Sequence, residues 1–441
     1  MDQPRKLPLQ AWLVTLAGTA VNLCLGILYA WSVWKANLIA NADHAAGTPM
    51  TGLNEGWWYL TDAEATWAYA VCGFVFALFM ILGGKIQDRY GPKLGATLGG
   101  LFLAGGCILA GLLKGYTGLI VGFGLLGGIG MGLAYAATTP AAVKWFGPHQ
   151  RGFIVGLVVG GYGGAAIYIS PLAQYLMVHF GLSGSFIGMG LLFALVVILA
   201  GQFLAWPPAG YKPPSPPGPD VKQTAMTSVD WRASEMLRTW QFYGLVFLFI
   251  GSAQSGLLVI GNATPMLNRT AGTVAFFIAN AWLLSSFGGF VNAAGRIGTG
   301  VYSDRIGRAN AYLVNGLISA TCLFLMPTVM QIGNVLLLFL AVGIAYWQYG
   351  GGLSLMPALT ADYFGSKNLG FNYGLVFIGW GIAFFVPQLA GYVKDVTGSL
   401  DYAFYLSGGV LIAAVITSRV LRRPLKAGEQ RENARPSTGG R

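Results

Sequence analysis

The chain has few charged residues and very little histidine or cysteine. Only 9% of its 441 residues are Asp, Glu, Lys or Arg, whereas a soluble domain carries about 25%. This deficit excludes an ordinary soluble globular protein. The four cysteines stand singly in apolar stretches, and the three histidines form no cluster with them. We therefore expect no disulfide, no metal site and no other cofactor. No combination of nucleophile and base suggests an enzyme, and no filter-like motif suggests a channel.

Hydrophobic residues and glycine are abundant. Hydrophobic residues make up 55% of the chain, and 66 residues are glycine. Membrane helices use glycine where backbones approach closely. A membrane-spanning helix needs about 20 mostly apolar residues. The sequence therefore predicts an all-α integral membrane protein with twelve transmembrane helices. Their expected limits are 10–37, 63–83, 94–113, 117–143, 152–179, 184–206, 240–266, 272–300, 309–330, 333–359, 369–393 and 402–421.

Two local signals refine these limits. The first apolar segment has no small-residue cleavage site and is too long for a signal-peptide core, so we interpret it as a retained helix. Thr61 and Glu64 have the spacing of a capping box and mark the start of the second helix.

The basic residues predict the orientation. Only Lys35, Lys114, Arg269, Lys394 and the mid-span Arg296 lie outside segments that are cytoplasmic if the N-terminus is cytoplasmic. Cytoplasmic loops of membrane proteins are enriched in Lys and Arg. We therefore expect both termini inside and a plasma membrane location, in a bacterium the inner membrane. This topology explains the net charge of +11 without a nucleic-acid partner.

A proline-rich stretch divides the chain nearly in half. Residues 207–220 read "PPAGYKPPSPPGPD", a composition that resists packing into a core. We expect an N-terminal six-helix bundle over 1–206, a cytoplasmic linker over 207–239, a C-terminal six-helix bundle over 240–423 and a cytoplasmic tail over 424–441.

The two halves repeat each other. "GKIQDRYGPK" (84–93) and "GVYSDRIGRA" (300–309) share the pattern G-x-x-x-D-R-x-G, and Asp88 and Asp304 are 304 − 88 = 216 residues apart. "WFGPHQRGFIVG" (145–156) and "YFGSKNLGFNYG" (363–374) match at an offset of 218. "PLAQY" (171–175) and "PQLAGY" (387–392) extend the repeat at an offset of about 217. Three matches in order at nearly one offset indicate a parallel duplication.

With these motifs the chain resembles the major facilitator superfamily over all twelve spans. "GILYAWSVW", "AAVKWFGPHQRG", "GGYG", "EMLRTWQFY" and "GRIGTGVYSDRIGR" resemble the oxalate:formate antiporter family in particular, which is similar to the proton-coupled monocarboxylate transporters. The resemblance implies two bundles around a central cavity that opens alternately to either side by rocking. It also implies that the charges near the repeated motif lock these states, which concerns Asp88, Arg89, Asp304 and Arg305.

Arg296 is the central candidate for substrate binding. It lies eight residues before Asp304, or about 12 Å along a helix, and so close to the middle of a roughly 30 Å core. Its counterpart in the first half, 296 − 216 = 80, is Met80. A structural role bonded to carbonyls is one alternative, but no acidic residue lies deep in an expected span. We therefore expect Arg296 to bind a substrate carboxylate in bidentate fashion, as the family resemblance also implies. Asn292, one turn earlier, shares its face.

Aromatic residues complete the expected site. Tyr29, Trp31, Tyr135, Tyr162 and Tyr349 match positions that line the substrate chamber in the family. The oxalate-exchanging members carry a lysine eight residues after the Asn of "NYG", and this chain has Trp380 there. One cation balances one carboxylate, so this departure favours a monocarboxylate over a dianion.

The hypothesis is a secondary transporter of small monocarboxylates such as lactate, pyruvate or formate. The related monocarboxylate transporters have Asp in place of Asn292, so proton symport and anion exchange both stay open. A dianion exchanger remains an alternative if Lys35 or another cation moves inward, and so does a sensor that binds ligand without flux. A multidrug exporter would need a buried acid, which we do not find. We expect a monomer in the lipid bilayer and an insert, rather than a lid, at 38–61.

Overall fold

The computed structural model describes residues 8–41, 43–211, 213, 230–365 and 368–425. These residues form helices and loops, with only two isolated β-bridges. The elements are α1 (Leu9–Leu25), η1 (Gly26–Ala30), α2 (Trp31–Leu38), η2 (Gly52–Asn54), α3 (Asp62–Tyr90), α4 (Pro92–Leu113), α5 (Gly115–Gly118), η3 (Leu119–Gly127), α6 (Gly128–Val143), α7 (Pro148–Gly164), α8 (Ala166–Gly201), α9 (Ala233–Met236), α10 (Trp240–Ala271), α11 (Ala275–Ala279), α12 (Leu283–Ile306), α13 (Arg308–Ile332), α14 (Val335–Phe364), α15 (Leu369–Ala383), α16 (Phe385–Thr397) and α17 (Asp401–Val420).

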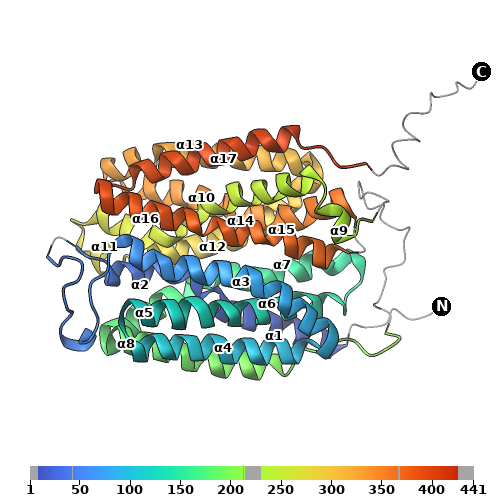
Figure 1. Cartoon of the computed structure of the whole chain (residues 1–441), viewed down its shortest axis with the longest axis horizontal. Helices are drawn as coiled ribbons and strands as arrows, with labels where there is room; N and C mark the ends of the chain where they lie inside the picture. The colour runs from blue at the N-terminus through green and yellow to red at the C-terminus, as the bar shows by residue number, and fades with distance from the viewer. Residues whose placement is uncertain (1–7, 42, 212, 214–229, 366–367, 426–441) are drawn as a thin grey trace, which may run out of the picture.

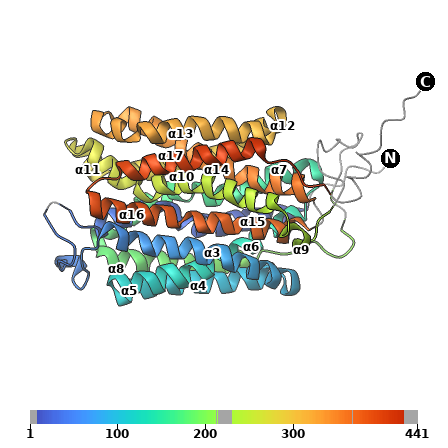
Figure 2. The same cartoon turned by 45° about the horizontal axis from the view of Figure 1, so that its top comes forward.

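The helices lie side by side in two groups that follow the two halves of the chain (Figure 1). The first half, α1 to α8, fills the blue and green side, and the second half, α10 to α17, fills the yellow to red side. The view turned by 45° shows the same division (Figure 2). We call the end with residues 39–61 the loop end and the end with α9 the linker end.

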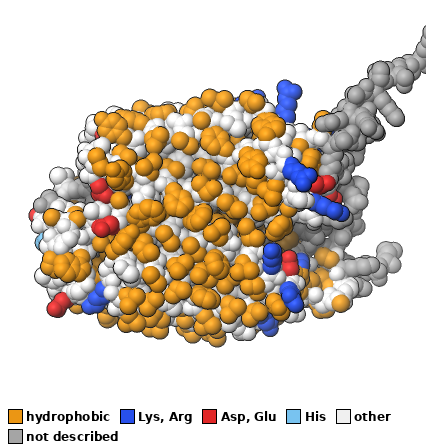
Figure 3. Space-filling view, viewed as in Figure 1, with side chains coloured by type: hydrophobic (Ala, Val, Ile, Leu, Met, Phe, Trp, Pro, Cys, Tyr) orange, Lys and Arg blue, Asp and Glu red, His pale blue; other side chains and the backbone are white. Residues whose placement is uncertain are grey.

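Ten helical segments of the described chain are long and apolar enough to cross a membrane. One of them, Phe153–Gly201, has 49 residues and bends at Gly181, whose φ of 70° is not helical. The helix α12 is not among the ten, because it carries Asn292, Arg296 and the charged end of the repeated motif. The face shown in Figure 3 agrees with a membrane protein, since its side chains between the two ends are mostly hydrophobic and its charged ones gather at the ends.

The repeated motif was predicted to lie in loops, but it lies within helices. The helix α3 continues to Tyr90 and α12 continues to Ile306, beyond the expected ends at 83 and 300. The reason is that hydropathy marks where a helix leaves the apolar layer, whereas the backbone hydrogen bonds continue. Each helix ends at the last glycine of the motif, Gly91 or Gly307, both with φ of 87°. Glycine adopts this conformation without the strain of a β-carbon.

Two further helix starts test the sequence analysis. The capping box of Thr61 and Glu64 at the start of α3 is confirmed. The expected start of the eighth span at 272 is wrong, because α12 begins at Leu283 and the separate short helix α11 precedes it.

The loop-end segment packs on the first half. Bridges pair Ile39 with Leu60 and Pro49 with Trp58. The indole of Trp57 donates to Ser183 Oγ over 2.9 Å. The described residues of 39–61 are thus attached to α8.

Candidate functional site

A break in the first long helix positions Tyr29. The 3₁₀ segment η1 separates α1 from α2, and Tyr29 is fully buried within it. The carbonyl oxygen of Tyr29 accepts a hydrogen bond from Ser285 Oγ in α12 over 3.1 Å. The break in the first half is therefore held by a side chain of the second half.

Arg296 in α12 is 5% exposed and is surrounded by neutral acceptors. Its Nε donates to Asn292 Oδ1 at 3.2 Å, its Nη1 to the carbonyl of Val159 at 3.1 Å and its Nη2 to Tyr29 Oη at 3.0 Å. A guanidinium has five N–H donors, so these three bonds leave 5 − 3 = 2 N–H groups, and the hydroxyl of Tyr135 also lies near the guanidinium. Val159 and Tyr29 belong to the first half, so Arg296 bridges the halves.

A chain of hydrogen bonds extends from Arg296 through the aromatic residues. Tyr29 Oη and Tyr349 Oη are 2.8 Å apart, and Trp380 Nε1 donates to Tyr349 Oη over 2.8 Å. The Tyr162 ring packs edge-on against Tyr29, with centroids 4.9 Å apart, and the ring of Tyr135 lies 5.4 Å from that of Tyr162. Side chains from both halves thus form one aromatic and polar cluster.

Two polar atoms of this cluster have no hydrogen-bond partner in the described structure. They are Tyr162 Oη and Asn292 Nδ2, both buried. The Tyr162 ring centroid is 6.0 Å from the guanidinium carbon of Arg296. An unpartnered buried donor costs a few kcal/mol, about 1–3. Together with the remaining N–H groups of Arg296, these donors suit a small anion with several acceptor oxygens.

The structure brings together seven of the eight residues expected to bind substrate. Trp31 is the exception. It stacks on Phe123, with centroids 4.6 Å apart, and packs against Phe186 inside the first half. It shares none of the hydrogen bonds or ring contacts that join the cluster. The reason is that residues two positions apart in a helical segment do not share a face, so Tyr29 and Trp31 point toward different neighbours.

The expected switch residues lie at the linker end. Asp304 is 3.6 Å from Arg308, and Arg308 also lies 3.3 Å from Asp362 of α14. Both pairs are within the second half. Arg89 lies over the ring of Tyr90, and Arg305 is exposed in the last turn of α12. In the described part of the chain, no ion pair joins these residues across the halves.

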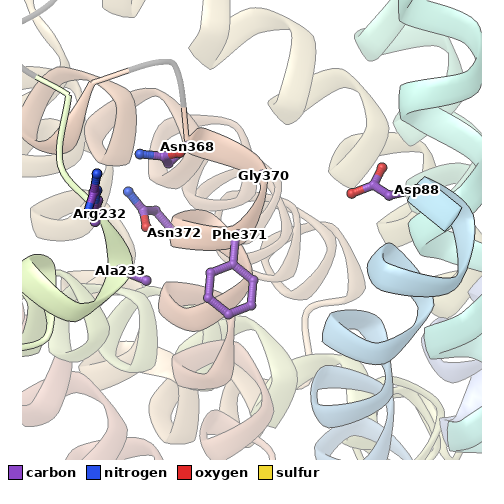
Figure 4. A pocket seen from close by; sticks show the side chains of 7 residues that line it. All are labelled: Asp88, Arg232, Ala233, Asn368, Gly370, Phe371 and Asn372. Carbon is purple, nitrogen blue, oxygen red and sulfur yellow. The ribbon is translucent and has the colours of Figure 1, made fainter.

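Asp88 lines a pocket of about 350 Å³ at the linker end. Figure 4 shows Asp88 on α3 facing Asn368, Phe371 and Asn372 at the start of α15. The pocket therefore separates the two halves at this end. Asp88 also acts on Lys144, since partial burial lowers the pKa of that ammonium and the Asp88 carboxylate opposes the shift.

The loop end carries a charged cluster that the sequence analysis missed. Lys35 and Asp62 are 0% and 3% exposed, and Lys35 Nζ lies 2.5 Å from Asp62 Oδ1. Lys394 from α16 pairs with the other oxygen of the same carboxylate. The sequence predicts both lysines on the outer side and indicates no partner for either. The available signal was a lysine in the last turns of one span followed by an acid at the first residue of the next.

Comparison with known proteins shows which family the chain resembles. The model of the Major Facilitator Superfamily matches residues 11–350 and 282–439. The chain is 26% identical over 376 residues to an uncharacterised transporter of that type from Escherichia coli (strain K12), covering 84% of this chain and 85% of the relative. It is 30% identical over 293 residues to the oxalate:formate antiporter of Oxalobacter formigenes, covering 66% of each. It is 24% identical over 442 residues to apicoplast pyruvate carrier 1 of Toxoplasma gondii, covering 83% and 80%.

Proposed function

Because the chain belongs to the major facilitator superfamily and is a multi-pass membrane transporter rather than an enzyme, we propose that its cargo is a small monocarboxylate of the lactate, pyruvate or formate class. The relatives include an oxalate:formate antiporter and a pyruvate carrier, which supports a small organic anion. We propose that the carboxylate binds at Arg296 and that the halves rock around it.

The observation that carries this proposal is the unbalanced charge of Arg296. Its side chain is buried, its three hydrogen bonds go to neutral oxygens, and no carboxylate of the described residues forms an ion pair with it. A charge inside a membrane protein is costly and marks function. A substrate carboxylate balances it, while Asn292 Nδ2 and Tyr162 Oη donate to the same anion. Tyr29, Tyr135, Tyr349 and Trp380 form the remaining wall.

A dicarboxylate exchanger is the second candidate, favoured by the similarity to the oxalate:formate antiporter. Two positions argue against it. Trp380 stands where a second cation is expected, and its indole N–H donates a hydrogen bond to the Tyr349 hydroxyl. Lys35, the other candidate cation, is paired with Asp62 at the loop end.

Anion exchange is the coupling mode that we favour. If the carrier reorients empty, it must do so around an uncompensated guanidinium, whereas a bound monocarboxylate neutralises it. No carboxylate of the described residues is in contact with Arg296 to accept a proton or to replace the anion. We therefore expect exchange to be faster than net uptake.

We also propose twelve membrane-crossing helices. The ten apolar segments become eleven when Phe153–Gly201 is divided at Gly181, and α12 makes twelve. The helix α1 begins and α17 ends at the linker end (Figure 1). The excess of Lys and Arg in the linker-side segments makes this end cytoplasmic. Asp88, Arg89, Asp304 and Arg305 then lie where the halves approach and separate on the cytoplasmic side.

Proteoliposomes test the proposal. Uptake of labelled lactate, pyruvate, formate and oxalate is measured with and without unlabelled anion inside, and with and without a pH gradient. We expect one of the monocarboxylates to exchange rapidly and oxalate to compete poorly. Uptake driven by the pH gradient into empty vesicles would instead establish proton symport. No carboxylate flux in any condition would overturn the transport proposal.

A further inference from the structure

The charged cluster at the loop end joins the two halves through two carboxylates, those of Asp62 and Asp395. Asp62 begins α3 in the first half and receives Lys35 from the same half and Lys394 from the second. In return, the carboxylate of Asp395 next to Lys394 accepts from the backbone N–H groups of Asp62 and Ala63 over 2.9 and 2.8 Å. Each half therefore supplies both a donor and an acceptor to the other.

Neutral contacts surround the ionic ones. Lys35 Nζ donates to Asn262 Oδ1 over 2.8 Å, and Ser32 and Thr264 form a hydrogen bond of 3.1 Å. Both bonds run between α2 of the first half and α10 of the second. Asn262 and Thr264 are 1% and 4% exposed, so this contact between the halves excludes water.

The charge of the cluster is balanced within each half. Lys35 and Asp62 cancel in the first half, and Lys394 and Asp395 cancel in the second. Separation of the halves therefore leaves no net charge on either surface. The cost of separation lies in the direct contacts, since a buried carboxylate that loses one cation loses a strong interaction. The cluster can thus hold the halves together and still come apart.

Among the described residues, the linker end has no ion pair that joins the halves; its charged contact across them is Lys85 Nζ of α3, 5.8 Å from the ring centroid of Phe371. Its ion pairs, Arg308 with Asp304 and with Asp362, lie within the second half. A pocket lies between Asp88 of α3 and Phe371 of α15. The halves are therefore joined by ion pairs at the loop end, whereas at the linker end a pocket lies between them.

We propose that Lys35, Asp62 and Lys394 form the gate of the loop end and set how often the transporter opens there. They are positioning residues, because they touch each other across the halves and lie apart from the Arg296 cluster. Asp62 is the shared element, since removing its charge breaks both ion pairs. This inference holds for any anion that the Arg296 site accepts.

Paired accessibility measurements test the gate. Single-cysteine reporters are placed at Thr264 (loop end) or Phe371 (linker end) in the full chain, with Cys24, Cys72, Cys107 and Cys322 replaced by serine. The purified protein in nanodiscs is then labelled with a maleimide. We expect Asp62→Asn to speed labelling at Thr264→Cys at least about tenfold and to slow labelling at Phe371→Cys.

Three further variants make the test specific. Lys394 is 28% exposed, so Lys394→Gln disturbs folding less, and we expect it to shift both reporters in the same directions. The double variant should label no faster than the stronger single variant, because both changes break one interaction. Glu55→Gln removes an exposed carboxylate of the same loop end and should change neither reporter.

Opposite changes at the two ends distinguish a shifted equilibrium from a loosened protein. Unchanged labelling in folded Lys394→Gln would overturn the gate. Faster labelling at both ends would also overturn it, because the cluster would then be a structural support only. If Asp62→Asn does not fold, Lys394→Gln decides the question.

Discussion

Replacing Arg296 with lysine keeps the charge and removes the fork that presents it. The guanidinium donates in three directions, to Asn292 Oδ1, to the Val159 carbonyl and to Tyr29 Oη, and keeps two N–H groups for a substrate. The lysine side chain is shorter, and its ammonium group offers one point of attachment. Loss of one charge-assisted hydrogen bond costs about 1.5–3 kcal/mol, which corresponds to a rise of about 10- to 150-fold in the half-saturation constant.

The assay is exchange of labelled monocarboxylate in proteoliposomes, using whichever anion the wild-type protein transports fastest. Arg269→Lys is the matched control, since Arg269 is an exposed arginine in the last turn of α10 and should leave the constant unchanged. Thermal unfolding of both variants verifies that they are folded. A half-saturation constant within about twofold of wild type for Arg296→Lys would refute bidentate binding, because one charge-assisted hydrogen bond is worth more than that.

Three further changes have definite expected outcomes. Trp380→Lys places a second cation near Arg296, so the preference for oxalate over lactate in competition assays should rise at least about tenfold; an unchanged ratio would show that this position does not face the anion. Tyr29→Phe removes the acceptor of Arg296 Nη2 and should slow exchange about tenfold, and wild-type rates would contradict the bridging role. Gly307→Ala forces alanine to φ of 87°, which costs about 1–3 kcal/mol and should lower the melting temperature. Gly300→Ala has open space around it and should not; equal melting temperatures would remove the strain argument.

The membrane class and the duplication could be read from the sequence because both are one-dimensional signals. Apolar runs of about 20 residues mark helices that cross a bilayer, and G-x-x-x-D-R-x-G recurs at a fixed offset. The last glycine of that motif, Gly91 or Gly307, has φ of 87° in both halves, so the backbone conformation repeats along with the sequence. The ends of the helices were harder to predict from the sequence, because hydropathy falls before the backbone hydrogen bonding stops.

Arg296 and Asn292 could be predicted from the sequence because they too give one-dimensional signals. An arginine eight residues from the nearest charge stands out in an apolar helix, and Asn292 follows from the period of the helix. The aromatic residues came only from the family resemblance. That resemblance did not separate Tyr29 from Trp31, although residues two positions apart in the expected helix lie on different faces.

The sequence by itself thus determined that the chain is a helical membrane protein built from two related halves, with one unbalanced cation in the second. These properties depend on composition and spacing along the chain. The tertiary structure alone decided which residues meet across the halves. It paired Lys35 and Lys394 with Asp62 and placed Tyr29 between Arg296 and Tyr349. The contacts across the halves, such as Asp62 with Lys394 and Tyr29 with Arg296, join residues hundreds of positions apart. Their energies depend on distance and burial, which no local pattern of the chain encodes.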